Sequence, residues 1–230
     1  MTEHKTSLES LNEAYSTLSP LERLEKIYSD FDTDKVLVTS SFGTTSVFML
    51  HLISQVNPKQ KVYFIDTGYH FKETIQYRRE VAKKLGLVVE SLHPDPLHHQ
   101  FTTQQQTWKK DPNLCCSVNK VLPLKELKAI HDVWVSGLIG QQNSYRQQVK
   151  IFGLQDDILK FHPIVDQSLA HVKQYIAKNQ LPINPLTTLG YGSIGCTHCT
   201  TKGDGRTGRW QNFSKTECGL HITDHDAVAI

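Results

Sequence analysis

The chain has 230 residues, of which 38% are hydrophobic and 21% are charged, and its formal net charge at pH 7 is +2. This size and composition allow an ordinary buried core and predict one α/β domain, or such a domain with an appended lobe. A net charge this small gives no support for non-specific nucleic-acid binding. The start "MTEHKTSLES" lacks the apolar run of a signal peptide, and no stretch approaches the length of a membrane span, which predicts a cytoplasmic protein.

Strands and helices alternate along most of the chain, after an amphipathic leader. Residues 35–40 form an apolar run that predicts a buried strand, the turn "SFGTTS" follows it, and residues 47–56 have a helical pattern. Residues 61–66 predict a second strand, and residues 71–86 predict a helix with Gly86 as its C-terminal cap. The order is that of strand, loop and helix units.

The alternation continues through the middle of the chain. Strands are predicted over residues 87–92 and 132–137, with a helix over residues 113–130 between them. Residues 161–179 predict a further strand, followed by a helix that is capped by Asp166. The remaining residues are rich in Gly, Thr and Pro, which predicts irregular structure. Together these elements favour an α/β fold with a mostly parallel sheet and crossover helices.

Three loops, "TSSFGTTS", "DTGYHF" and "SGLIGQQNSYR", are expected to meet beyond the carboxyl ends of the strands, where open α/β sheets bind ligands. The first loop brings hydroxyls, small side chains and backbone N–H groups to a helix N-terminus, which is how proteins hold an oxyanion. Its candidate substrate-binding residues are Ser40, Ser41, Gly43 and Thr44. The GK[ST] ending of a Walker sequence is missing, so an ordinary polar turn is an equal alternative. Asp66 is suited to orient a ribose hydroxyl or to cap the following helix.

Four cysteines form two pairs, the adjacent Cys115 and Cys116, and Cys196 and Cys199 in "CTHC". Such a set predicts one site with four thiolate ligands. Zinc is one candidate, because it binds four sulfurs around a tetrahedral centre. Adjacent side chains on a helix diverge by about 100°, so the first pair reaches separate irons of a cluster more readily than one small ion. The pattern favours a [4Fe-4S] cluster over zinc, and buried cysteines without a metal are the third alternative.

The remaining cysteine, Cys218 in "KTECGLH", is free if the other four bind a metal. Its basic neighbours in the sequence are Arg206, Arg209, Lys215 and His221. Cationic neighbours favour the thiolate, which is the nucleophilic form of the side chain. The sequence therefore predicts a catalytic Cys218 on a flexible C-terminal segment, and an inert surface thiol is the alternative.

The most specific motifs of the chain are "DPNLCCSVNKVLPL", "GYGSIGCTHCT" and "GRWQNFSKTECGLH", together with "DTGYHFKET" and "WVSGL". Through these motifs, residues 35–221 show a resemblance to the assimilatory adenylylsulfate and phosphoadenylylsulfate reductases, in particular to their cluster-bearing branch. The resemblance implies a doubly wound, mostly parallel sheet of the adenine nucleotide alpha hydrolase-like (PP-loop) type, with an irregular C-terminal segment. It also implies a helical leader over residues 1–34, a nucleotide-binding reductase domain over residues 35–200, and a flexible segment over residues 201–230 that carries Cys218.

The resemblance also assigns roles to individual residues. The four paired cysteines match the ligands of a [4Fe-4S] cluster, Cys218 matches the nucleophile, and Lys120 matches a lysine between cluster and substrate. The segments that contact the nucleotide and its sulfate contribute Arg146, Arg206, Arg209 and His221. The implied reaction is reduction of adenylylsulfate to sulfite and AMP through a Cys218 thiosulfonate, within sulfate assimilation and cysteine biosynthesis. Its implied electron donor is thioredoxin or a glutaredoxin-like protein, and a homo-oligomer is compatible with the resemblance.

Two departures from the family pattern concern the substrate. Ile139 and Gly140 stand where family members often carry two arginines, and the loop "SSFGTTS" is closer to that of clusterless phosphoadenylylsulfate reductases. Because cluster-bearing members generally prefer adenylylsulfate, the four cysteines favour this substrate, with phosphoadenylylsulfate as the alternative. A PP-loop ATP pyrophosphatase is a less favoured alternative, because it would be expected to carry an "SGGxDS" loop where this sequence has "SSFGTTS". A zinc-bearing nucleotide-binding module is also less favoured, because it assigns no role to Cys218.

Overall fold

A six-stranded sheet forms the centre of the computed structural model, which describes residues 7–221. The strands are β1 (Val36–Thr39), β2 (Lys61–Ile65), β3 (Val88–Leu92), β4 (Val133–Ser136), β5 (Phe152–Gln155) and β6 (Ile158–Phe161). They lie in the order β3-β2-β1-β4-β6-β5, and every neighbouring pair is parallel except β5 and β6 at one edge. The predicted α/β fold with a mostly parallel sheet is confirmed.

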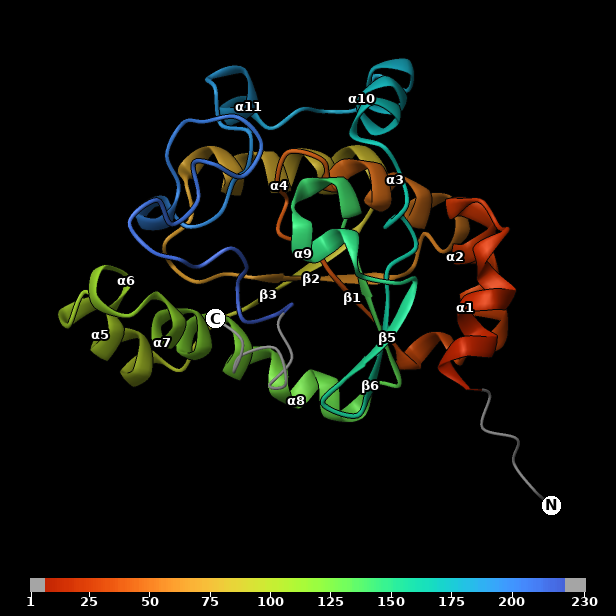
Figure 1. Cartoon of the computed structure of the whole chain (residues 1–230), viewed down its shortest axis with the longest axis horizontal. Helices are drawn as coiled ribbons and strands as arrows, with labels where there is room; N and C mark the ends of the chain where they lie inside the picture. Colours follow the sequence, from red (N-terminus) through yellow and green to blue (C-terminus); the bar gives the residue numbers. More distant parts are fainter. Residues whose placement is uncertain (1–6, 222–230) are drawn as a thin grey trace.

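Helices cover both faces of the sheet, with α3 and α4 on one face and α8 on the other (Figure 1). The helices before β4 are α1 (Leu8–Ser16), α2 (Pro20–Asp30), α3 (Ser46–Val56), α4 (Lys72–Leu85), α5 (Pro96–Gln104), α6 (Thr107–Lys110), α7 (Pro112–Cys116) and α8 (Leu122–Ile130). Those after β4 are α9 (Ser144–Gln147), α10 (Leu169–Lys178) and α11 (Pro185–Thr188). As predicted, Gly86 caps α4 in the left-handed conformation, with φ 65°. Within residues 7–221, no helix has the length and apolar character needed to cross a membrane.

The central strands β1 and β4 are apolar because helices cover both of their faces. Val36, Leu37 and Val38 are at most 2% exposed, and all of β4 is buried. The two strands pair in register, so that Thr39 lies beside Ser136 where both strands end. The strand order runs away from β1 on one side through β2 and on the other through β4. In a doubly wound sheet, this point of reversal is where a ligand pocket forms.

The prediction of a strand that begins at Phe161 is wrong, because β6 ends at this residue. β6 forms a hairpin with β5, for which the sequence analysis contained no prediction. The two strands are joined through Asp156 and Asp157, with φ values of 49° and 63°. Aspartate adopts this left-handed conformation more easily than most residues, because its short side chain can bond to the local backbone. Each strand has only four residues, which is too short for a clear alternating pattern.

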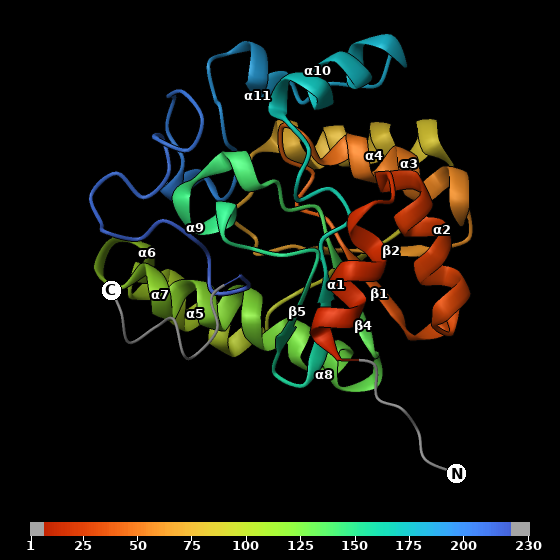
Figure 2. The ribbon, with the colours of Figure 1, turned by 45° about the vertical axis from the view of Figure 1, so that its right-hand side comes forward.

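The edge strand β5 is covered by α1 (Figure 2). The side-chain amide of Asn12 accepts from the backbone N–H of Phe152 (3.0 Å) and donates to its carbonyl (3.1 Å). Tyr15 packs edge-on against the ring of Phe152, with 4.7 Å between the ring centroids. A helix that satisfies an edge strand in this way protects it from pairing with another chain.

The predicted cap at Asp166 is also wrong. Ser168 is the N-cap residue of α10, and its side chain accepts from the backbone N–H of His171. The Asp166 carboxylate instead accepts two hydrogen bonds from Arg23 of α2, at 2.8 and 2.6 Å. The Arg23 side chain is 1% exposed, so it needs a counter-charge where it is buried. This pair joins the N-terminal helices to the segment that follows β6.

Asp166→Asn should therefore lower the free energy of unfolding by about 1–2 kcal/mol, because it leaves a buried guanidinium without its anion. Urea denaturation measures this change. Glu90→Gln is the matched control, since Glu90 pairs with Lys61 on the surface, where both side chains are about half exposed. The control should change stability by less than about 0.5 kcal/mol. Equal losses in the two variants would contradict the assignment of Arg23 and Asp166 as a stabilising pair.

Candidate active site

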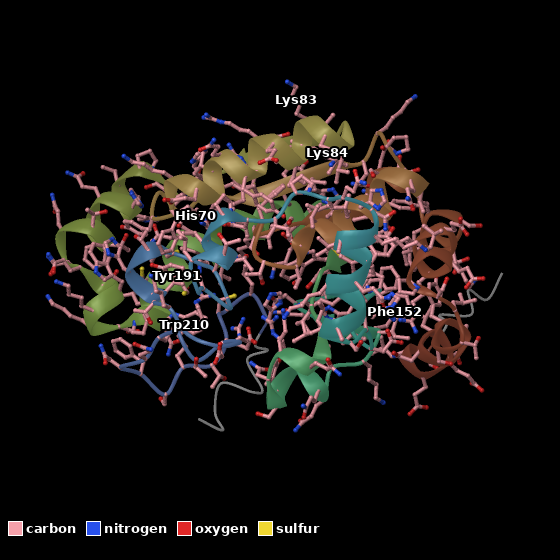
Figure 3. All side chains as sticks on the ribbon, turned by 90° about the horizontal axis from the view of Figure 1, so that it is seen from above. His70, Lys83, Lys84, Phe152, Tyr191 and Trp210 are labelled. Atoms are coloured by element: carbon pink, nitrogen blue, oxygen red, sulfur yellow. The ribbon has the colours of Figure 1, made fainter. Side chains whose placement is uncertain are left out.

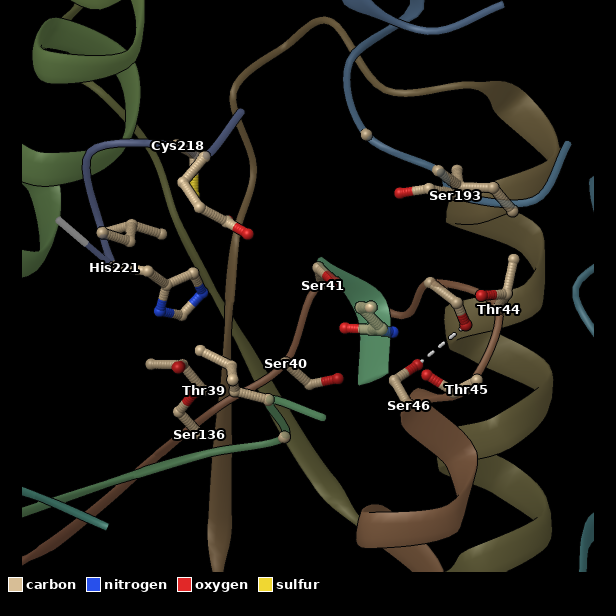
Figure 4. Close-up of a pocket in the computed structure, with 18 of the residues that line it drawn as sticks. Thr39, Ser40, Ser41, Thr44, Thr45, Ser46, Ser136, Ser193, Cys218 and His221 are labelled. Carbon is tan, nitrogen blue, oxygen red and sulfur yellow. Dashed lines mark hydrogen bonds between the residues drawn. The ribbon is translucent and has the colours of Figure 1, made fainter. Parts of the chain in front are cut away.

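A pocket lies at the edge of the sheet where β1 and β4 end. Figure 4 shows Cys218 and His221 on one side of this pocket, and Thr44, Thr45 and Ser193 on the other. Most of the wall comes from the loop after β1, the loop after β4 and the irregular C-terminal part of the chain. Ile65, His70 and Lys120 complete it, so regions far apart in the sequence are brought together only by the fold.

The loop after β1 lines the pocket with the four residues that the sequence analysis selected, Ser40, Ser41, Gly43 and Thr44. Its shape is held by the hydroxyl of Ser40, which accepts from the backbone N–H of Phe42 at 3.2 Å. Phe42 is fully buried and has a φ of 48°. The N-cap residue of α3, Thr45, makes no capping side-chain hydrogen bond. The N-terminus of α3 thus faces the pocket without a side-chain cap of its own, which suits an anion.

Asp66 lies outside this wall. Its carboxylate accepts from the backbone N–H of Gly68 at 3.1 Å, and Gly68 has a φ of 74°. The N-cap residue of α4 is Phe71, so Asp66 does not cap the following helix. Of the two roles that the sequence suggested for Asp66, helix capping is therefore wrong. Asp66 closes a tight turn and is not among the described residues that line the pocket.

A second, smaller cavity adjoins the pocket, and the four paired cysteines line it. Cys115 and Cys116 lie on α7, whose first turn is capped by the carboxylate of Asp111. The backbone at Cys196 forms an isolated antiparallel β-bridge with the backbone at His70, in the loop after β2. This bridge and α7 bring the two cysteine pairs to one place, although they are far apart in the sequence.

The four cysteine side chains line one cavity without the geometry of a formed metal site in the described chain. Within residues 7–221, no three His, Cys, Asp or Glu side chains are grouped closely enough to hold a metal ion. Burial and the neighbouring sulfurs of Cys196 and Cys116 raise the pKa of Cys199 to about 11. Four thiolates at this place therefore require a strong positive charge among them. A metal centre bound by thiolates supplies such a charge.

Lys120 lies between the two cavities and lines both. It belongs to a π-helical turn, Ser117–Val121, which joins α7 to α8. Burial alone would lower the pKa of Lys120, but the sulfurs of Cys116, Cys196 and Cys218 outweigh burial and raise it. Lys120 is therefore a fixed cation between the cysteine cavity and the pocket. A π-turn inside a helix is often found at a functional site.

Arg146 and Arg206 line the pocket, but a carboxylate already binds both. Glu217 accepts from Arg146 at 2.5 and 2.8 Å and from Arg206 at 3.2 Å. Burial would raise the pKa of Glu217, yet the hydrogen bonds and charges of the two arginines lower it below its usual value. The sequence analysis did not select Glu217, although it stands directly before Cys218. An acidic residue among so many basic ones was the available signal.

Arg209 has neutral partners. Its guanidinium donates to the Cys199 carbonyl (3.3 Å) and to the Ser193 hydroxyl (3.4 Å), and it lies 4.3 Å from the centroid of the Trp210 ring. A β-carbon on Gly195 would come within 2.3 Å of this guanidinium, so the glycine leaves space for the Arg209 side chain in its present position. Figure 3 shows Trp210 on the opposite side of the molecule from Phe152 of β5. Arg209 is thus a cation of the pocket wall that no carboxylate of the described chain neutralises.

The last described residues lie against β4 and β6. The ammonium of Lys160 donates to the Leu220 carbonyl (2.9 Å) and lies 4.5 Å from the Trp134 ring centroid. Burial lowers the pKa of Lys160 to about 7. Burial, and the charge of Lys160, also hold the pKa of His221 well below its usual value. His221 therefore faces the pocket as a neutral ring, and Lys160 is a further residue that the sequence analysis missed.

The two residues that replace the family's arginines do not line the pocket in the described chain. Ile139 is fully buried in the main core. The backbone N–H of Gly140 donates to the Val165 carbonyl at 2.7 Å, and a β-carbon at Gly140 would come within 2.9 Å of that carbonyl. Close backbone packing at this position excludes a long side chain.

The sequence and the fold both have known relatives. The family model described as "Phosphoadenosine phosphosulfate reductase domain" matches residues 35–202. A protein of Bacillus cereus named adenosine 5'-phosphosulfate reductase is 37% identical over 222 residues, which cover 92% of this chain and 94% of that protein. A protein of Lysinibacillus sphaericus with the same name is 38% identical over 210 residues, which cover 87% and 90%.

Solved structures agree with these relatives. The phosphate complex of phosphoadenylyl-sulfate reductase from Candida auris has a TM-score of 0.73 and 27% identity, and the match covers 87% of this chain and 99% of that one. The fold is also that of NMN synthetase from Francisella tularensis, with a TM-score of 0.53, 13% identity, and coverage of 74% and 71%. On the matched residues 35–202 and the identity along most of its length, the chain belongs to the phosphoadenosine phosphosulfate reductase family.

Proposed function

We propose that this protein is an adenylylsulfate reductase, which converts adenylylsulfate to sulfite and AMP. The observation that carries the proposal is a cysteine, Cys218, on the wall of a pocket that also contains Lys120, Arg209 and the uncapped N-terminus of α3. These cations and N–H groups suit a substrate with a phosphate and a sulfate. The relatives in Bacillus cereus and Lysinibacillus sphaericus carry the name of this activity.

The first step joins the substrate to the protein. The Cys218 thiolate attacks the sulfur of the sulfate group, a bond forms between the two sulfurs, and the bond from that sulfur to the phosphate oxygen breaks. The bonding electrons leave with AMP, and Cys218 then carries a thiosulfonate. Because a thiolate approaches an anionic group, nearby cations must offset the repulsion, and Lys120 and Arg209 are placed to do so.

The second step releases sulfite. A thiolate of the donor, for which we propose thioredoxin or a glutaredoxin-like protein, attacks the Cys218 sulfur. The bond to the sulfonate breaks with its electrons on sulfite, and a mixed disulfide remains. The second thiol of the donor resolves it, so that the donor dithiol supplies both electrons. We propose that the segment over residues 201–221 moves Cys218 between pocket and donor, with residues 222–230 outside the described chain.

We also propose that Cys115, Cys116, Cys196 and Cys199 hold a [4Fe-4S] cluster. The support is one cavity lined by the four cysteine side chains, two of which are adjacent on α7 and so point in different directions. When bound, such a cluster supplies a charged centre whose electrostatic field acts on the neighbouring pocket. The contribution of this chain is Lys120, which lies between that cavity and Cys218.

Phosphoadenylylsulfate is the second candidate substrate, and the likeness to the Candida auris enzyme favours it. It carries one more phosphate, which needs additional cationic contacts. Arg146 and Arg206 already bind Glu217, and the backbone packing at Gly140 excludes a long side chain there. The pocket therefore offers few cations for a further phosphate, and we propose adenylylsulfate as the preferred substrate.

Cys218→Ser should fold normally but form no sulfite, because an alcohol supplies essentially no anionic nucleophile near neutral pH. Intact mass measurement after mixing with adenylylsulfate should detect a sulfonate adduct on the wild type alone. Circular dichroism serves as the control for folding. Sulfite production by the serine variant would rule out Cys218 as the nucleophile.

Protein purified without oxygen should contain about four irons and about four inorganic sulfides per chain. Cys199→Ser should lose most of the iron and the visible absorption of the cluster, because one ligand is missing. Metal analysis and absorption spectroscopy measure both. One zinc per chain with no iron would overturn the cluster and favour a structural metal site.

Adenylylsulfate should have a higher kcat/KM than phosphoadenylylsulfate, with some activity remaining on the latter, because the pocket has few cations to offset desolvation of the additional phosphate. Steady-state assays with reduced thioredoxin and each nucleotide measure this ratio. An advantage for phosphoadenylylsulfate of about tenfold, equal to about 1.4 kcal/mol, would reverse the assignment.

A further inference from the structure

The carboxylate of Glu217 is completely bound by other side chains, and Glu217 directly precedes the reactive cysteine. One oxygen accepts from Arg146 Nε (2.5 Å) and Asn143 Nδ2 (2.8 Å). The other accepts from Arg146 Nη2 (2.8 Å) and Arg206 Nη2 (3.2 Å). The Glu217 side chain is 1% exposed. A carboxylate held by two guanidinium groups in this way has a closely defined position.

The partners of Glu217 come from two other parts of the chain. Arg146 lies on α9, and Asn143 is the N-cap residue of that helix. The Asn143 side chain accepts from the backbone N–H of Arg146 at 2.8 Å and donates to Glu217, so one residue orients both members of the pair. Arg206 belongs to the glycine-rich segment before Trp210. Glu217 therefore joins the chain around Cys218 both to the loop after β4 and to the glycine-rich segment that contains Arg206.

Further contacts hold the chain around Cys218. Arg206 donates to the Thr216 carbonyl at 2.9 Å, Lys215 donates to the Asn113 side chain, and the His221 ring stacks on Trp134. No helix or strand is present between residues 200 and 221 of the described chain. After Cys218, the segment is held by a hydrogen bond from Lys160 to the Leu220 carbonyl and by one from Tyr145 to the His221 carbonyl. Before Cys218, the hydrogen bonds of Thr216 and Lys215 are exposed, whereas those from Arg146 to the Glu217 carboxylate are buried.

We propose that Glu217 is a positioning residue of the reaction. Its ion pairs with Arg146 and Arg206, here called the clasp, hold Cys218 at the pocket. This inference rests on the proposed function. The two arginines thereby hold the segment that carries the nucleophile, through a carboxylate that is buried between them. Arg209 and Lys120 remain for the anion. The clasp consists of hydrogen bonds between charged groups, so it can open for the donor and close again.

The test measures how well Cys218 is shielded in the full-length protein without nucleotide. Iodoacetamide is added without oxygen, and the labelled C-terminal tryptic peptide is quantified. This peptide follows Lys215 and contains Cys218 as its only cysteine. Rates are compared at the alkaline plateau, where the thiol is fully ionised in every variant, so a change in its acidity cannot contribute. Glu217→Gln keeps the shape but removes the charge, and it should raise the rate about tenfold.

Two further variants make the result specific. Asn143→Asp can still cap α9, but it cannot donate to Glu217 and places a second negative charge beside it, so the rate should again rise about tenfold. Asp166→Asn is the matched control, because it breaks an arginine–carboxylate pair away from the pocket and should leave the rate unchanged. If Glu217→Gln does not fold, Asn143→Asp decides. Rates equal to the wild type in the folded variants would overturn the proposal.

Activity separates this inference from the proposed function. With adenylylsulfate, Glu217→Gln should lower kcat and leave KM unchanged, because the Glu217 carboxylate is bound by protein side chains and acts by positioning the nucleophile. A raised KM with unchanged kcat would instead assign Glu217 and its arginines to substrate binding and overturn the inference. If the wild type forms no sulfonate adduct while the labelling rates differ as expected, the proposed function is wrong. The role of Glu217 in holding Cys218 at the pocket is then still supported.

Discussion

Repulsion among cations at one edge of the sheet is the constraint on which the arrangement of this site depends. Lys120, Arg146, Arg206 and Arg209 all line one pocket. Burial, and to a lesser degree the charge of Arg146, lower the pKa of Arg206 to about 10. Like charges that are partly removed from water repel strongly, so anions placed among these cations stabilise the arrangement.

The anions come from three sources. Within the protein, Glu217 neutralises the charge of two arginines, and the sulfurs near Lys120 offset the charge of that lysine. In the part of the chain that is described, Arg209 has no carboxylate partner, so its charge is left for a ligand. The pocket is therefore arranged so that its excess positive charge is small and localised. This explains how a strongly basic wall can exist in a protein whose formal net charge is only +2.

The sheet and the position of the pocket could be predicted because their signals are local. Apolar runs mark the buried strands, and polar residues mark the points where the strands end, as at Thr39 and Ser136. Pairing between distant residues could not be predicted in this way. Asp166 binds Arg23, 143 positions away, and a serine that could serve as the cap stood two residues further on. Glu217 was missed for the same reason, since its main partner, Arg146, is 71 positions away in the sequence and only the fold brings the two together.

The π-turn between α7 and α8 makes this part of the protein sensitive to chain length. Each residue of a helix advances the side chains by about 100° around the axis, and a π-turn accommodates a residue that a regular α-helix would not. Loss of one residue from Ser117–Val121 would allow regular α-helical bonding. It would also rotate Lys120 relative to Cys115 and Cys116 on the preceding helix. A substitution here changes single contacts. An insertion or deletion would rotate all the side chains on one side of the turn relative to those on the other side, and so displace Lys120 from the cysteine cavity.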